Sequence, residues 1–195
     1  MIKAIIFDCF GVLVTSSYEP FKAQYLQNDP DLLKKFMQVE DQSSRGQISL
    51  EQAEIEFAEI AGISFQDTST FLQDNPRNEL LLRYIAQELK GKYKISMLSN
   101  VADNRIHELF TANDIELFDD MVLSYQVGLA KPDIRIYKMT VERLGLLPEE
   151  CVFIDDIPYY CNGAEEIGIK TVLYENFRQM KIEVEKILEV ADSDK

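Results

Sequence analysis

The segment Phe7-Asp8-Cys9-Phe10-Gly11-Val12 gives the clearest indication of how this chain folds. It closes a short apolar run over residues 3–9, which predicts a buried β-strand. Open parallel sheets bind their ligands outside the carboxyl ends of the strands, where this aspartate and glycine would lie. Alone, the motif is equally typical of a plain turn, so its meaning depends on the remaining strands.

Four further apolar runs alternate with helical patterns along the chain. This alternation is typical of a parallel β-sheet covered by helices. The apolar runs predict strands over residues 93–99, 121–124, 151–155 and 170–174. The helical patterns predict helices over residues 78–90, 102–112, 133–144, 159–167 and 177–190. The first, third and fourth of these helices would end at Gly91, Gly145 and Gly168.

Residues 16–76 interrupt the alternation, because they contain helical patterns but no convincing strand. Asp29-Pro30 is typical of an N-cap followed by a first-turn proline. Ser49-Leu50-Glu51-Gln52 is typical of a capping box, and the helix that it opens would end at Gly62. We therefore expect an α/β core over residues 1–15 and 78–195, with an inserted helical cap over 16–77. The insertion either packs on the core or covers a site at the strand ends.

The composition excludes several classes of protein. The 195 residues include 34 acidic and 20 basic side chains, a formal net charge of −14, and 46% are hydrophobic. Such a chain can bury a sizeable core, and its acidic surface disfavours nucleic acids and anionic membranes as partners. No apolar stretch approaches the roughly 20 residues of a spanning helix, and no signal peptide is evident. Three cysteines without a C-x-x-C pair indicate a reducing cytoplasm.

Chemically useful side chains stand at the ends of the predicted strands. Carboxylates are the ligands that hard cations such as Mg²⁺ prefer, whereas lysine and hydroxyl groups bind anions. Such side chains follow four of the predicted strands, and chance alone would rarely produce all four in one chain. The candidate residues are Asp8, Ser99, Asn100, Lys131, Asp155 and Asp156.

In order and spacing, these motifs resemble those of the haloacid dehalogenase (HAD) superfamily. The four matching segments are Phe7-Asp8-Cys9-Phe10-Gly11-Val12, Met97-Leu98-Ser99-Asn100, Gly128-Leu129-Ala130-Lys131-Pro132-Asp133 and Phe153-Ile154-Asp155-Asp156. The resemblance implies an α/β fold, with a Rossmann-like three-layer core, a five-stranded parallel sheet and a small inserted helical cap. Bacterial sugar-phosphate phosphatases and the N-terminal phosphatase domain of soluble epoxide hydrolases share this arrangement. It also implies a Mg²⁺-dependent phosphatase that acts on a small phosphorylated metabolite.

The resemblance assigns roles to individual residues. Asp8 would be the nucleophile and form an aspartyl-phosphate, while Lys131 would neutralise charge between nucleophile and substrate. The implied magnesium ligands are Asp8, the backbone carbonyl of Phe10 and Asp156. Asp155 would be either a further ligand or a neighbour that contacts the ligands. The implied phosphate-binding residues are Ser99, Asn100 and Lys131.

Two positions depart from the family pattern. HAD phosphatases usually carry an aspartate two residues after the nucleophile as general acid and base, and Phe10 stands there. This cap class often has asparagine four residues after Asp156, and Tyr160 stands there, either as a packing residue or in substrate recognition. Without proton transfer, a phosphatase would lose a contribution of about 10²–10⁴-fold and would favour good leaving groups.

Phe10 leaves two alternatives open. HAD-type dehalogenases have an aromatic residue at this position and use the aspartate to displace halide without a metal. The paired carboxylates Asp155 and Asp156 favour metal and phosphate over halide. The other alternative is a catalytically weak protein that binds a ligand or partner. The single histidine, His107, is expected on the surface, and Tyr18, Phe21 and Tyr25 are expected to pack between cap and core.

Overall fold

The computed structural model describes residues 1–193, and its centre is one parallel β-sheet. The strand order is β3-β2-β1-β4-β5. The strands are β1 (Ala4–Phe7), β2 (Lys94–Ser99), β3 (Asp120–Leu123), β4 (Cys151–Asp155) and β5 (Lys170–Leu173). All five predicted strands are confirmed, each within two residues of its expected ends.

Strand β1 lies in the middle of the sheet, between β2 and β4. Its four residues are all buried, as expected for a parallel strand that is covered on both faces. Because side chains alternate along a strand, Ile5 and Phe7 join one hydrophobic cluster while Ala4 and Ile6 join another. The cores on the two faces of the sheet therefore meet at this strand.

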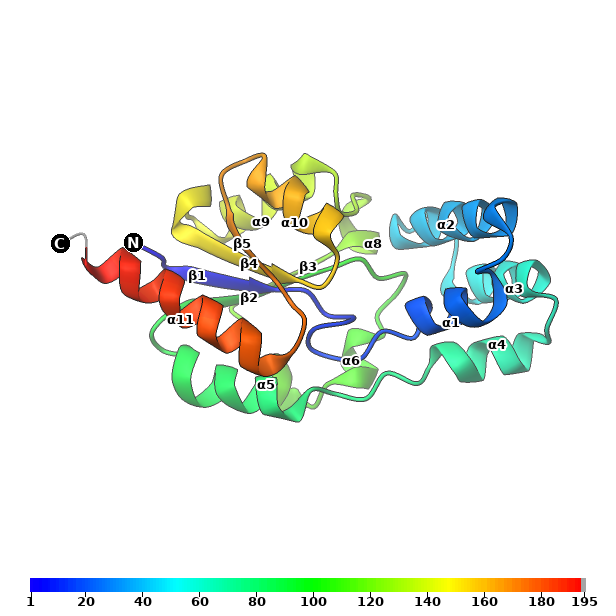
Figure 1. Ribbon diagram of the computed structural model, residues 1–195, viewed down its shortest axis with the longest axis horizontal. Coiled ribbons are helices and arrows are strands. Elements are labelled where there is room, and N and C mark those ends of the chain that lie inside the picture. The colour runs from blue at the N-terminus through cyan, green and yellow to red at the C-terminus, as the bar shows by residue number, and fades with distance from the viewer. Residues whose placement is uncertain (194–195) are drawn as a thin grey trace.

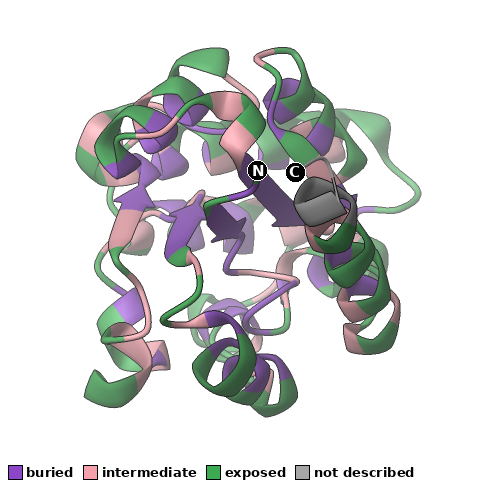
Figure 2. Ribbon diagram, turned by 90° about the vertical axis from the view of Figure 1, so that its left-hand side faces the viewer, coloured by how far each residue is buried: buried purple, intermediate pink, exposed green. Residues whose placement is uncertain are grey.

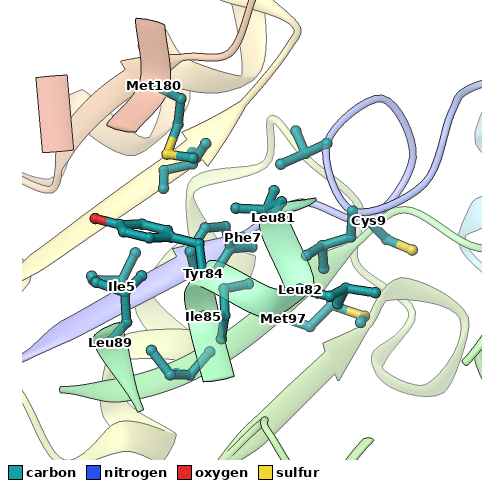
Figure 3. Close-up of a cluster of buried hydrophobic side chains, with 14 of the residues drawn as sticks. Ile5, Phe7, Cys9, Leu81, Leu82, Tyr84, Ile85, Leu89, Met97 and Met180 are labelled. Carbon is teal, nitrogen blue, oxygen red and sulfur yellow. The ribbon is translucent and has the colours of Figure 1, made fainter. Parts of the chain in front are cut away.

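Helices cover both faces of the sheet (Figure 1). One face carries α5 (Glu79–Tyr84), which continues as a π-helical turn, η1 (Ile85–Leu89), and α11 (Phe177–Ser193). Figure 3 shows Leu81, Ile85 and Met180 of these helices gathered over Ile5 and Phe7. The other face carries α9 (Ile134–Leu144) and α10 (Pro158–Glu165), and a short 3-10 turn, η2 (Pro148–Glu150), precedes β4. Figure 2 shows the buried strands enclosed by helices with exposed outer faces.

Four helices are inserted after β1 and lie beyond the end of the sheet at which the strands end (Figure 1). They are α1 (Tyr18–Tyr25), α2 (Pro30–Ser44), α3 (Leu50–Ala61) and α4 (Phe65–Leu72), here called the four-helix segment. The segment has its own aromatic core, in which the stacked rings of Phe36 and Phe57 are 4.1 Å apart. Phe21 is buried there, and Tyr18 and Tyr25 pack against the same cluster. These aromatic residues therefore pack inside the segment, whereas the sequence predicted packing between cap and core.

Side-chain caps fix two helix starts in this segment. The Asp29 carboxylate accepts hydrogen bonds from the backbone N–H groups of Asp31 and Leu32, and Pro30 opens α2 as predicted. The Ser49 hydroxyl accepts from the N–H of Gln52 at the start of α3. The Gln52 side chain donates to Glu56 instead of returning to residue 49. The predicted cap is therefore present, but the reciprocal half of the predicted capping box is not.

The two ends of the four-helix segment are joined side by side to the core. Val14 and Arg77 form an antiparallel β-bridge, and the N–H of Thr15 donates to the carbonyl of Pro76 at 2.9 Å. The side-chain amide of Asn75 donates to the carbonyl of Thr15 and to the Ser17 hydroxyl, both at 3.1 Å. The chain therefore leaves the core and returns to it at one place.

The predicted helix over residues 102–112 is wrong. The structure has two short helices there, α6 (Ile106–Leu109) and α7 (Ala112–Ile115). Phe110 is extended and buried in the core beside them, which ends α6. Thr111 then starts a new helix, because its hydroxyl and the Asp114 carboxylate form a reciprocal capping box. His107 lies on α6 and is exposed, as predicted.

The described residues contain no helix whose length and apolar character would let it cross a membrane. Cys9, Cys151 and Cys161 are free thiols, and all three are buried. They pack in the core as small apolar side chains.

Candidate active site

The ends of β1 and β4 bring three carboxylates together. Asp8 follows β1, Asp155 ends β4, and Asp156 comes next. One oxygen of each lies within 4.8 Å of the others. Oδ1 of Asp156 is buried and has no hydrogen-bond partner among the described residues. A group of carboxylate oxygens with one buried oxygen left unpartnered fits a hard divalent cation such as Mg²⁺.

Lys131 connects two of these carboxylates. It stands in the loop after α8 (Ser124–Val127), and only 2% of it is exposed. Its Nζ is 2.7 Å from Oδ1 of Asp8 and 2.6 Å from Oδ2 of Asp155. Burial alone would lower the pKa of Lys131, but the two carboxylates raise it above its usual value. The two carboxylates therefore favour the charged ammonium form of Lys131.

The site still holds more negative than positive charge. Burial raises the pKa of Asp8, the Lys131 ammonium opposes the rise, and the Asp155 carboxylate adds to it. Burial and the neighbouring Asp155 likewise raise the pKa of Asp156, to about 6. In both shifts burial is the main cause, and the crowding of three acidic groups around one lysine adds to it. A divalent cation would remove this excess.

The Asn100 side chain holds the main chain of Lys131. Its Oδ1 accepts from the Lys131 N–H at 2.8 Å, and its Nδ2 donates to the Lys131 carbonyl at 3.0 Å. The sequence had suggested only a phosphate-binding role for Asn100, and this positioning role was missed. Ser99 beside it is fully buried, and its Oγ makes no hydrogen bond within the described part of the chain.

A cavity of about 80 Å³ lies between the strand ends and the four-helix segment. Asp8 and Lys131 line it from the core, together with Phe10 and Tyr160. The opposite wall comes from α1 and α2 and includes Tyr18, Glu19, Glu40 and Ser43. The predicted nucleophile and lysine therefore share one enclosed space with side chains of the inserted helices.

Phe10 and Gly11 shape the turn after Asp8. Phe10 is half-buried, lines the cavity and packs against the core cluster, so no proton-transferring group stands at this position. Gly11 has φ of +97°, and a Cβ there would lie 2.2 Å from Oδ2 of Asp156. Glycine is required here both by the left-handed backbone and by the close approach of the carboxylate.

Tyr160 contacts the lysine and also faces the cavity. The Lys131 Nζ lies 4.9 Å from the centre of its ring, and its hydroxyl accepts from Asn100 Nδ2 at 3.4 Å. Its backbone carbonyl accepts from the Tyr137 hydroxyl at 2.8 Å. Tyr160 is therefore a packing residue around Lys131 that also forms part of the cavity wall.

Arg105 is a cavity residue that the sequence analysis missed. It precedes α6, is 8% exposed, and lines the same space as Asp8 and Lys131. The signal that could have found it is a basic residue a few positions after Ser99-Asn100. The predicted helix over 102–112 placed it instead on a helix face.

The fold and the carboxylate cluster at its strand ends are those of a haloacid dehalogenase-like hydrolase. The family model of that description matches residues 2–168. The chain therefore belongs to the haloacid dehalogenase-like hydrolase family, and the expected HAD-like fold is confirmed.

Curated relatives include a phosphatase of similar length. The sesquiterpene phosphatase astK of Aspergillus oryzae is 27% identical over 177 residues, which are 86% of this chain and 87% of that protein. Acyl-CoA dehydrogenase family member 10 of the mouse is 29% identical over 203 residues, covering 95% of this chain. The chain spans only 19% of the length of the mouse protein.

Solved structures of the family share the fold. The HAD family enzyme bt-2542 of Bacteroides thetaiotaomicron, in complex with magnesium and inorganic phosphate, superposes with a TM-score of 0.67. It is 27% identical, and the match covers 88% of this chain and 93% of that one. L-2-haloacid dehalogenase of Xanthobacter autotrophicus has a TM-score of 0.64 at 19% identity, covering 88% and 76% of the two chains. At that identity the likeness extends to the fold alone.

Proposed function

We propose that this hydrolase is a Mg²⁺-dependent phosphatase that acts on a small phosphorylated metabolite, such as a sugar phosphate. The carboxylate cluster of Asp8, Asp155 and Asp156, with Lys131 between two of its members, carries the proposal. The sesquiterpene phosphatase relative and the bt-2542 complex with magnesium and phosphate support it.

Magnesium would be held by carboxylate oxygens of Asp8 and Asp156 and by the Phe10 carbonyl, with Asp155 as a further ligand or as a neighbour. The donor set is all oxygen, as this ion prefers. When bound, the ion would offset the negative charge of the carboxylates and of the phosphate. Asp155 also accepts from the N–H of Ile157 at 2.8 Å and from Lys131, so its orientation is fixed by contacts on this chain.

Asp8 would act as the nucleophile. One of its oxygens forms a bond to phosphorus as the ester P–O bond breaks, which gives an aspartyl-phosphate and an alkoxide that takes its proton from water. Water then attacks the aspartyl-phosphate, releasing inorganic phosphate and regenerating the Asp8 carboxylate. Lys131 neutralises charge as phosphate and carboxylate approach, and Ser99 and the main chain of Asn100 bind the phosphate oxygens with it.

The four-helix segment would serve as a cap. In this proposal residues 1–15 and 78–195 form the catalytic core, and residues 16–77 cover its open end. The cavity wall from α1 and α2 supports this division, because side chains there face Asp8 across the cavity. The cap would then choose the substrate, while the core carries out the chemistry.

Phe10 would restrict the leaving group. No carboxylate at this position can protonate the departing alcohol, so substrates whose leaving group needs little protonation are favoured. Sugar-1-phosphates, acyl phosphates and aryl phosphates have such leaving groups. Equal rates on matched aryl and alkyl phosphates would contradict this preference.

A panel of phosphorylated metabolites, with 4-nitrophenyl phosphate and 2-chloropropanoate added, tests the proposal. We expect phosphate release that needs Mg²⁺, stops in EDTA and is abolished in Asp8→Asn. Asp31→Asn is the matched control, because Asp31 is exposed on α2. Metal-independent release of chloride would support a dehalogenase instead, the alternative that the aromatic Phe10 favours. Absence of any turnover would leave a protein that binds a ligand or partner without efficient catalysis.

A further inference from the structure

Arg105 is anchored at the junction between the core and the four-helix segment. Its Nη2 donates to Oδ1 of Asn75 at 3.1 Å, and Nη1 and Nη2 share the Leu72 carbonyl at 3.5 Å. Both acceptors lie on the stretch that leads from α4 to the core. The guanidinium is thus fixed against the cavity by contacts to neutral groups only.

Its charge has no counterion in the described part of the chain, since no carboxylate oxygen there lies within 4.0 Å of the Arg105 guanidinium. The other charged groups of the cavity are already paired. Lys131 contacts Asp8 and Asp155, while Glu19 and Glu40 share Lys22, at 2.5 and 3.8 Å. An unpaired buried cation is costly, so a site built around one favours an anionic ligand.

Arg105 and Ser43, which line the same cavity, both have unused hydrogen-bond donors. A guanidinium has five N–H donors, and the contacts made by Arg105 leave Nε–H and one Nη1–H unused among the described residues. The Ser43 hydroxyl lies on the wall of the same cavity, is 2% exposed, and has no hydrogen-bond partner in residues 1–193. A ligand with anionic oxygen atoms would satisfy both side chains.

We propose that Arg105, assisted by the Ser43 hydroxyl, binds a second anionic group of the substrate, a carboxylate or a second phosphate. The inference rests on the proposed function, because Asp8 and Lys131 would take the phosphate that is transferred. The substrate class is then a small phosphorylated acid or bisphosphate. The body between the two groups must fit in the cavity that Asp8, Lys131 and Arg105 all line.

Three non-hydrolysable probes with the same two-carbon spacer test this inference by calorimetry on the Mg²⁺-loaded protein. Propylphosphonate carries a terminal methyl group, 3-phosphonopropanoate a carboxylate, and ethane-1,2-diylbisphosphonate a second phosphonate. We expect at least one of the two probes that carry two anionic groups to bind the wild type about 10–100-fold more tightly than propylphosphonate. The better probe also distinguishes a carboxylate from a phosphate as the second group.

Substitutions assign the preference to Arg105. We expect the Arg105→Gln variant to bind the better probe about as tightly as propylphosphonate. The Arg105→Lys variant should keep part of the difference in affinity. Arg83→Gln, at an exposed position on α5, should leave it unchanged. A purely structural Arg105 would instead weaken all three probes equally. If Arg105→Gln does not fold, the test uses the ratio of the affinities for the better probe and propylphosphonate. This ratio should be high in the wild type and smaller in Ser43→Ala.

Equal affinities for the three probes in the wild type, or an advantage that persists in Arg105→Gln, would overturn the inference. The proposed phosphatase activity is measured separately, with 4-nitrophenyl phosphate and Mg²⁺. Turnover without a preference among the probes would remove only the Arg105 site. Tighter binding of a probe with two anionic groups, without turnover of 4-nitrophenyl phosphate, would support the Arg105 site and contradict the proposed phosphatase activity.

Discussion

Asn100 and Lys131 are joined through one side-chain amide that accepts the lysine's N–H and donates to its carbonyl, at 2.8 and 3.0 Å. The amide thus fixes the main chain of the residue whose ammonium lies between Asp8 and Asp155. The position of the positive charge beside Asp8 therefore depends on a neutral residue at the end of a different strand.

Asn100→Ala should reduce both stability and catalysis. Two hydrogen bonds to the Lys131 main chain are lost, so we expect unfolding in urea to require about 1–3 kcal/mol less free energy. Displacement of the ammonium should lower kcat by up to about 10²-fold, measured with 4-nitrophenyl phosphate. Asn113→Ala, at an exposed position on α7, is the control. Unchanged kcat in Asn100→Ala would show that Lys131 is positioned without this amide.

The raised pKa of Asp156 predicts a pH-dependent gain in stability for Asp156→Asn. Its folded pKa of about 6 exceeds the usual 3.8, so its contribution to stability is fully present below pH 3.8 and lost as pH rises through 6. In EDTA, the variant should gain about 1–2 kcal/mol relative to wild type between pH 4 and pH 8, after allowance for partial exposure. Urea unfolding at both pH values measures this difference. Mg²⁺ at pH 8 should stabilise the wild type more than Asp156→Asn. A difference in stability that does not change with pH would contradict the raised pKa of Asp156.

Gly11→Ala should damage the metal site as well as the fold. The added Cβ would lie 2.2 Å from an Asp156 oxygen, on a backbone with φ of +97°. Gly62→Ala is a matched control, because its φ is +68° and nothing lies within 4 Å of its added Cβ. We expect the control to lose about 1–2 kcal/mol, and Gly11→Ala a further 1–3 kcal/mol or so.

Magnesium titration of the two glycine variants separates the backbone effect from the contact with Asp156. Binding of Mg²⁺, followed by calorimetry, should weaken only in Gly11→Ala. Equal losses of stability and affinity in the two variants would mean that Gly11 is needed for its backbone conformation alone.

Phe10→Asp should restore proton transfer to the leaving group. Phe10 already lines the cavity beside Asp8, so a carboxylate there is placed to protonate a departing alcohol. We expect kcat/KM for propyl phosphate to rise about 10²-fold relative to that for phenyl phosphate. Phe10→Asn has nearly the same shape as Phe10→Asp and cannot transfer a proton. If both variants changed the ratio alike, the gain would come from loss of the ring.

The sheet could be predicted because its central strands β1, β2 and β4 are buried on both faces and so form short apolar runs. The helix over 102–112 could not be predicted from spacing alone. Phe110 continues the apolar pattern of that stretch, yet it is extended in the structure. The capping box between Thr111 and Asp114 favours a fresh start over a continuous helix. Within that stretch the local pattern was right only for residues 106–109 and 112, because cap chemistry set where the helices begin and end.

The cluster of Asp8, Asp155 and Asp156 was predictable because strand order places their strand ends side by side. The roles of Asn100 and Arg105 were not. Asn100 holds a main chain 31 residues away, and Arg105 donates to Asn75, 30 residues away. Such contacts depend on how separate elements pack, and the spacing of residue types along the chain carries no sign of them.

The bridge between Val14 and Arg77 brings the two ends of the inserted helices together where they join the core. Facing residues of an antiparallel bridge have Cα atoms only about 5 Å apart. Any folded insert with ends that close together could replace residues 17–75 without altering a strand of the sheet. Selection could thus exchange the cavity wall formed by α1 and α2 as a whole, while the carboxylates and the lysine stay where the strands place them.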